Sequence, residues 1–231
     1  MFYDVFETIK KSGALYDYAA LAQQIARVDG VLDCSVLKKP RNWEADSYIL
    51  KYETGVGRYC VKIYPDYYPQ AAQMYAQPHF LDKLWQAGLC PKIHGTNVHR
   101  NNHDDSWRIV IYDYIHGVAL DDIVPNAEEE IIREVKTNLK ITARRLIELG
   151  AHPWIKDLGD FIQVRSESGK SAVVMTDINA LSDVQLADEH TKINLFDRLT
   201  TGFIDKIVVQ EYIKFTDVRP AIAALKDNTT R

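Results

Sequence analysis

The chain has 231 residues, of which 46% are hydrophobic and 26% charged, and its formal net charge is −4. This composition is typical of a globular protein with a sizeable core, and it argues against a general binder of nucleic acids or membrane surfaces. No run of about 18 apolar residues predicts a membrane-spanning helix. The first 11 residues lack the pattern of a secretory signal. Three widely spaced cysteines favour a reduced, cytoplasmic setting.

The chain opens with a helix followed by strands. Residues 16–28 have apolar side chains at helical spacing and are followed by Gly30, which predicts a helix. Strand-like runs follow at 31–38, 46–52 and 58–64. Their connections are too short to contain crossover helices, so the three strands should form an antiparallel meander.

A helical pattern and two further strands complete the N-terminal half. Residues 69–87 have a helical pattern that Pro78 interrupts, and because proline is tolerated in a first helical turn, a new helix should begin there. Strands are expected at 92–98 and 107–114, and an extended link should follow near 113–117.

The C-terminal half is predominantly helical. A long helix is predicted over 126–149, with acidic residues at its start. Two short strands at 161–164 and 172–175 flank a Ser-Glu-Ser-Gly turn and predict a hairpin. Helices are expected at 192–214 and 218–225. Strands that precede helices in this way predict the α+β class.

Charged and polar residues stand at the joints between these elements. They are Lys62 on the third strand, Asp113 and Tyr114 at the end of the strand at 107–114, Asp157 and Asp160 after the long helix, and Asp177 after the hairpin. Their order and separation resemble the protein-kinase-like superfamily over about residues 31–200. The resemblance is closer to the small-molecule branch, which includes aminoglycoside and choline phosphotransferases and lipopolysaccharide core kinases, than to signalling kinases.

The resemblance implies a bilobal α+β fold that binds ATP and Mg²⁺ in a cleft between the lobes. It implies an N-terminal helical extension at 1–30 and an N-lobe at 31–115, formed by an antiparallel sheet and a helix. A mostly helical C-lobe with the catalytic hairpin would occupy 116–231.

The resemblance also implies roles for residues of the N-lobe. Lys62 would bind the α- and β-phosphates of ATP. The loop between the first two strands lacks glycine. It would either bring Arg41 and Asn42 to the phosphates or be a basic surface turn. Backbone groups near Asp113 and Tyr114 would contact the adenine edge.

In the C-lobe, Asp157-Leu158 resembles the Asp-Leu pair of the family's catalytic loop, which makes Asp157 the candidate base. The family has an asparagine five residues after its aspartate, whereas here Asp160 follows after three. Either the loop is shortened, or Ile155 holds the position of the base. Asp160 and Asp177 would bind Mg²⁺, because a carboxylate is a hard oxygen ligand.

The implied activity is transfer of the γ-phosphate of ATP to the hydroxyl of a sugar, another small molecule or a protein. The alternative is a weakly active or inactive pseudokinase that serves as a nucleotide- or partner-binding regulatory module. The shortened loop supports this alternative, as does the lack of a glutamate between Gln70 and Gly88. The superfamily usually pairs its lysine with such a glutamate. An unrelated α+β protein is the third possibility.

Overall fold

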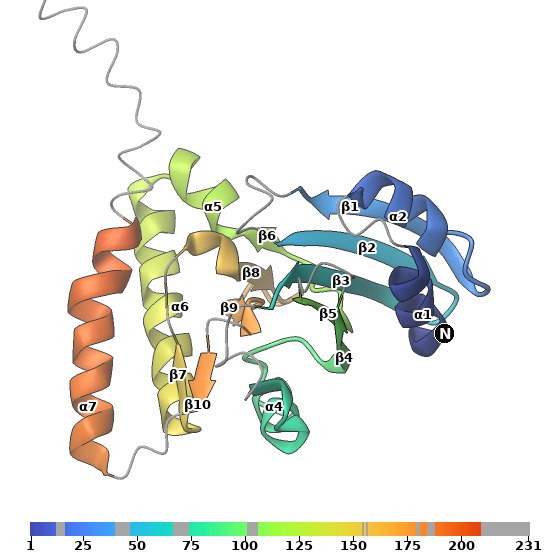
Figure 1. Cartoon of the computed structure of the whole chain (residues 1–231). Coiled ribbons are helices and arrows are strands. Elements are labelled where there is room, and N and C mark those ends of the chain that lie inside the picture. Colours follow the sequence, from blue (N-terminus) through green and yellow to red (C-terminus); the bar gives the residue numbers. More distant parts are fainter. Residues whose placement is uncertain are drawn as a thin grey trace, which may run out of the picture. The chain divides into compact units, whose positions relative to one another are not determined.

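The computed structural model describes residues 1–12, 17–39, 47–66, 74–100, 106–153, 155, 157–178, 181–183 and 188–208. The chain divides into two compact units, Met1–Ile115 and His116–Arg231, and each is described by itself (Figure 1). The first unit contains a sheet with helices, and the second contains a long helix and a β-hairpin. The predicted α+β class is therefore confirmed.

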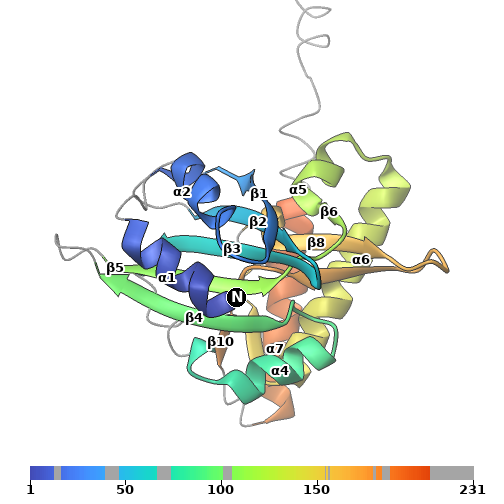
Figure 2. The same cartoon turned by 90° about the vertical axis from the view of Figure 1, so that its right-hand side faces the viewer.

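The first unit is built on a five-stranded antiparallel sheet with the order β1-β2-β3-β5-β4 (Figure 2). The strands are β1 (Val31–Lys38), β2 (Tyr48–Thr54), β3 (Gly57–Pro65), β4 (Ile93–Arg100) and β5 (Ser106–Asp113). The predicted meander of the first three strands is confirmed. The last two strands were predicted near 92–98 and 107–114, and β5 lies between β3 and β4, which makes β4 an edge strand.

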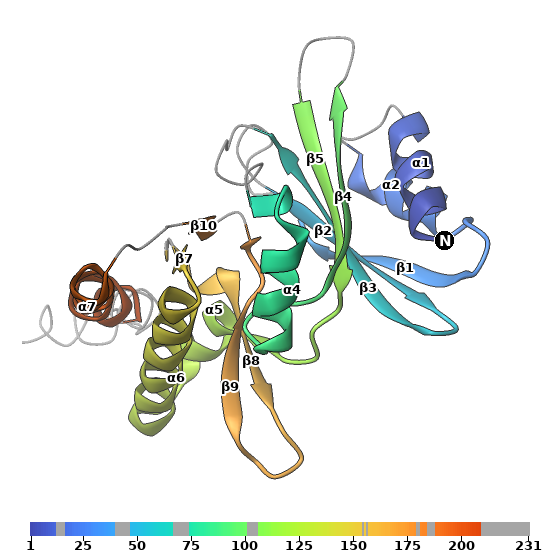
Figure 3. The ribbon, with the colours of Figure 1, turned by 90° about the horizontal axis from the view of Figure 1, so that it is seen from below.

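Helices lie on both faces of this sheet. Figure 3 shows α1 (Phe2–Ser12) and α2 (Tyr18–Ile25) on one face and α4 (Pro78–Gln86) on the other. The helix predicted at 16–28 is α2, and α4 begins at Pro78 as predicted. The helix α1 lies within the helical extension implied at 1–30, although no separate helix was predicted before residue 16, and it buries Val5, Phe6 and Ile9. The predicted helical stretch at 69–73 lies outside the described residues.

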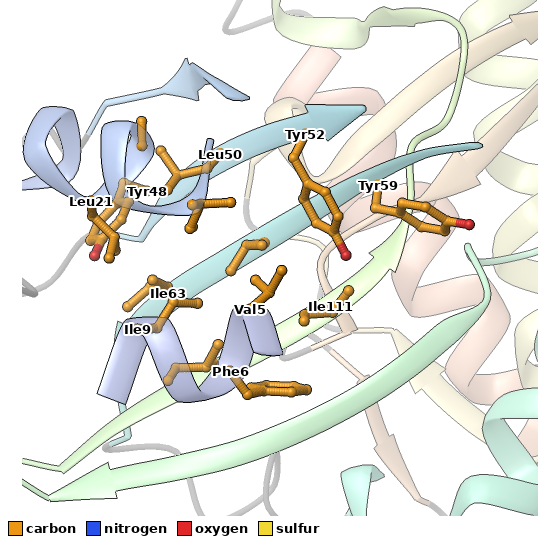
Figure 4. Packing of buried hydrophobic residues seen from close by; sticks show 14 of the residues in the cluster. Val5, Phe6, Ile9, Leu21, Tyr48, Leu50, Tyr52, Tyr59, Ile63 and Ile111 are labelled. Carbon is orange, nitrogen blue, oxygen red and sulfur yellow. The ribbon is translucent and has the colours of Figure 1, made fainter. Parts of the chain in front are cut away.

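The core of the first unit lies under α1 and α2 (Figure 4). Fully buried members include Val5, Ile9, Leu21, Leu50, Val61, Ile63, Ile109 and Ile111. On β3 the core residues are Tyr59, Val61 and Ile63. Because successive side chains of a strand point to opposite faces, Lys62 faces away from this core.

The second unit combines a β-hairpin with several helices. Its elements are β6 (Val118–Ala119), α5 (Leu120–Ile123), η1 (Val124–Asn126), α6 (Glu129–Glu148), β7 (Ala151–Pro153), η2 (Leu158–Asp160), β8 (Phe161–Arg165), β9 (Ser171–Met175), β10 (Leu181–Asp183), α7 (Glu189–Arg198) and η4 (Leu199–Ile204). The hairpin β8–β9 is antiparallel, and β6 adds a third strand beside β8. Thr142 of α6 donates a hydrogen bond to the carbonyl of Val173 at 2.8 Å, which joins the long helix to the hairpin.

Several element boundaries in the second unit differ from the prediction. The long helix begins at Glu129 rather than 126, because the short helices α5 and η1 precede it. The helix predicted from 192 begins at Glu189, where Asp188 caps it, and passes into the π-helical segment η4. Residues 209–231, including the helix predicted at 218–225, lie outside the described residues. Throughout the described part of the chain, helices are too short or too polar to cross a membrane.

Candidate functional site

Lys62 is a buried cation on the face of the sheet opposite the aromatic and aliphatic core. Lys62 is 5% exposed, and its Nζ lies 5.6 Å from the centre of the Tyr64 ring. Lysine is almost never buried this far unless its ammonium group has a polar or charged partner. Arg41 and Asn42, which were predicted to join it, lie outside the described residues.

A second buried cation, Arg108, lies on the same face of the sheet, on β5. Its guanidinium donates to both oxygens of Asp66, with Nε–Oδ1 at 2.9 Å and the second bond at 3.2 Å, and it lies over the ring of Tyr75. The sequence interpretation did not consider this pair, because Asp66 directly follows a strand and Arg108 is 42 residues later. Asp66 is thus an acid that pairs with a buried cation on the Lys62 face of the sheet, and it lies outside the range 70–88 in which a glutamate was sought.

The end of β5 is held by the backbone of its neighbours. The amide of Asp113 donates to the carbonyl of Lys92, and that of Tyr114 donates to the carbonyl of Arg58, both at 3.0 Å. Backbone groups near Asp113 and Tyr114 were predicted to contact adenine. Because both amides are used inside the unit, carbonyl oxygens rather than these two donors would contact a base here.

In the second unit, two short paired strands frame the acidic segments. The strands β7 and β10 are antiparallel, with Ala151 opposite Asp183 and Pro153 opposite Leu181. The segment with Asp157 and Asp160 leaves β7, and Asp177 lies in the segment that leads to β10. The pairing places the segment before the hairpin next to the segment after it. Neither strand could be predicted, because three residues are too few for a periodic pattern.

Asp160 and Asp177 come together at the base of the hairpin. The carbonyl of Asp160 accepts hydrogen bonds from the amide of Thr176 at 2.8 Å, from its hydroxyl at 3.1 Å and from the amide of Asp177 at 3.4 Å. The first pair of the hairpin register, Phe161 with Met175, lies beside them. Both aspartates are half-buried. The hairpin thus brings together the backbones of two aspartates that are 17 positions apart.

This pair of acids fits a magnesium ion. Mg²⁺ binds through one or two carboxylates and completes its octahedral shell with water and substrate phosphates. No group of three or more His, Cys, Asp and Glu residues in the described ranges is arranged to hold a metal by itself. Water and phosphate oxygens are the usual remaining ligands of a Mg²⁺ ion that two carboxylates hold.

Asp157 is exposed and begins the helical turn η2, where its Oδ1 accepts a hydrogen bond from the amide of Gly159 at 2.9 Å. Asp121 of α5 also lies close to this turn. A Cβ atom on Gly159 would lie 2.8 Å from Asp121 Oδ2 and 3.4 Å from Asp157 Oδ1. Glycine permits this close approach. Asp121 is thus a further acid beside the candidate base, and it was not predicted.

His152 of β7 makes stability depend on pH. Burial lowers its pKa, and the charge of Arg198 lowers it further. The unfolded chain therefore binds a proton at His152 more readily than the folded chain does once the pH falls below about 6.5. We expect the free energy of unfolding to decrease between pH 7.5 and 5.5, and the decrease to be smaller in His152→Gln.

Urea unfolding at several pH values measures this effect, and His190→Gln is the control because His190 is exposed at the start of α7. The control should retain the pH dependence of the parent. An unchanged slope in His152→Gln would show that other groups cause the loss of stability.

A family model described as the phosphotransferase enzyme family matches residues 37–152, about half of the chain. Among curated proteins, none matches this chain. The matched range includes Lys62, Arg108 and the end of β5, and it ends before Asp157, Asp160 and Asp177. The chain is a protein-kinase-like protein and belongs to the phosphotransferase enzyme family.

Proposed function

We propose that the protein transfers the γ-phosphate of ATP, in the presence of Mg²⁺, to a hydroxyl group of a small molecule or a protein. The observation that carries the proposal is the meeting of Asp160 and Asp177 at the hairpin base, in a chain that belongs to a phosphotransferase family. Bound Mg²⁺ would neutralise charge on the phosphates. In kinases, positioning and charge stabilisation supply most of the catalysis.

The side chains have separate roles in this proposal. Lys62 binds the α- and β-phosphates through its ammonium group, and Asp160 and Asp177 bind the metal. Asp157 orients the acceptor hydroxyl and takes its proton. The nucleobase lies at the end of β5, near Asp113 and Tyr114. If Arg41 and Asn42 act, they contact the phosphates.

Three observations favour the alternative of a nucleotide-binding module without turnover. Asp157 Oδ1 already accepts the amide of Gly159, and only three positions separate Asp157 from Asp160. The other candidate for the base position, Ile155, is buried and apolar and has no group that accepts a proton. A chain that binds Mg-ATP but does not consume it, with or without small alcohols and sugars, would favour this alternative.

Thermal unfolding with and without Mg-ATP tests the proposal. A ligand at 100 times its dissociation constant stabilises the folded state by about 2.7 kcal/mol, so the midpoint should rise clearly in the parent. Lys62→Met keeps the apolar stem and removes the charge, and it should lose most of this rise. Lys83→Met, an exposed position on α4, is the matched control and should retain it. A parent midpoint that Mg-ATP does not change would contradict nucleotide binding.

A further inference from the structure

A β-bulge in the edge strand β4 redirects the side chain of His94. The register shifts between Ile93, which lies opposite Tyr112, and Gly95, which lies opposite Ile111. Bulges of this kind re-aim a side chain. Here the imidazole Nε2 of His94 lies 2.5 Å from Asp113 Oδ1, at the last residue of β5.

The N-terminal helix α1 packs on this bulge through aromatic side chains. The ring of Phe2 stacks on the imidazole of His94, with centroids 4.5 Å apart and an angle of 18° between the planes. Tyr59 packs edge-on against both rings, at 5.2 Å from His94 and 4.9 Å from Phe2.

Phe6, one turn further along α1, requires the glycine of the bulge. A Cβ atom on Gly95 would lie 2.9 Å from a ring carbon of Phe6. Two aromatic rings of α1 therefore pack against two consecutive residues of the bulge, His94 and Gly95. Figure 4 shows Phe6 and Tyr59 on this side of the sheet.

We propose that Phe2 and His94 are positioning residues for nucleobase binding, and that α1 acts through them on the end of β5. The inference rests on the proposed function, because it takes the region of Asp113 and Tyr114 as the place of the base. The backbone there is fixed by the two amide hydrogen bonds to Lys92 and Arg58.

The carboxylate of Asp113 is fixed by His94, and the stacked ring of Phe2 holds His94 in its rotamer. Removing either ring releases the Asp113 side chain, which is 37% exposed, and loosens the residues that follow it. The effect should be confined to the base, since Lys62 lies elsewhere on the sheet and on strand β3.

Calorimetric titration with two probes, Mg-ATP and inorganic tripolyphosphate with Mg²⁺, tests this inference. In His94→Ala and Phe2→Ala the dissociation constant of Mg-ATP should rise at least about fivefold, a common size for coupling between neighbouring sites. That of tripolyphosphate, which has no base, should stay within about twofold of the parent value. Tyr3→Ala, at a 71% exposed position of the same helix, is the matched control and should change neither constant.

Two conservative variants separate positioning from loss of folding. His94→Gln keeps an N–H donor for Asp113 and should recover part of the affinity for Mg-ATP, whereas Phe2→Leu keeps the apolar bulk without the stacked ring and should not. Unchanged Mg-ATP affinity in both alanine variants overturns the inference. So does an equal loss for both probes. A parent that binds neither probe overturns the proposed function, and this inference with it.

Discussion

Asp177→Asn is expected to lower the rate of ATP consumption at saturating nucleotide by at least about 100-fold, the usual effect of removing one group that stabilises transition-state charge. The substitution keeps the size of the side chain and replaces a carboxylate with a neutral amide. The backbone hydrogen bonds between Thr176, Asp177 and Asp160 do not depend on the carboxylate, so the hairpin base should keep its geometry. The loss of rate should therefore come from weaker binding of Mg²⁺ and not from a change in the structure of the hairpin.

Asp160→Asn provides a matched comparison at the other acid. The family that the chain resembles has asparagine at this position, and an amide oxygen also binds Mg²⁺. We expect this variant to stay within about tenfold of the parent rate and to need a higher Mg²⁺ concentration. Asp197→Asn, on the exposed side of α7, should behave as the parent.

Steady-state rates over a titration of Mg²⁺ distinguish the three variants. If Asp177→Asn kept the parent's rate and its metal dependence, Asp177 would not bind the metal, and the resemblance at the end of the hairpin would be incidental. A parent that consumes no ATP with any hydroxyl acceptor would leave the nucleotide-binding module as the better account of the site.

The hairpin shows why part of this site could be predicted from sequence. Residues 161–164 and 172–175 are short, mostly apolar runs joined by a Gly-containing turn, so local signals define both strands. Once they pair, the residues just before the first strand and just after the second must meet, which brings Asp160 beside Asp177. On β3, by contrast, residues on both faces are buried, so only the structure shows that Lys62 lies on the face opposite the core formed by Tyr59, Val61 and Ile63.

Contacts between distant segments could not be predicted in this way. The pairing of β7 with β10 involves only three residues on each strand, too few for a periodic pattern. The helix α1 has a strong apolar face, but its anchors are a bulge in β4 and the aromatic ring of Tyr59. Asp121 lies near Gly159 because α5 packs on η2, and a four-residue helix has no sequence signature. These features depend on tertiary packing rather than on propensity.

Removing one partner of the ion pair between Arg108 and Asp66 should lower the free energy of unfolding strongly. Replacing both partners together should not. The two side chains are 7% and 15% exposed, so Asp66→Asn leaves a buried guanidinium without its counter-charge. Breaking a buried pair from one side costs about 3–5 kcal/mol of the free energy of unfolding. Unfolding in guanidinium chloride, followed by tryptophan fluorescence, measures this loss. Trp107, which precedes Arg108 in β5, provides a probe in the same unit.

Two comparisons separate the cost of an unpaired charge from general disruption. Glu53→Gln removes the partner of the more exposed Lys51 and Arg58 and should cost less than about 1 kcal/mol. The double variant with Asp66→Leu and Arg108→Met replaces both charges with apolar groups and should recover most of the stability. If Asp66→Asn also costs less than about 1 kcal/mol, the guanidinium is compensated by other groups. If the double variant is stable but binds Mg-ATP more weakly than the parent, the ion pair contributes to nucleotide binding on the Lys62 face of the sheet rather than to stability.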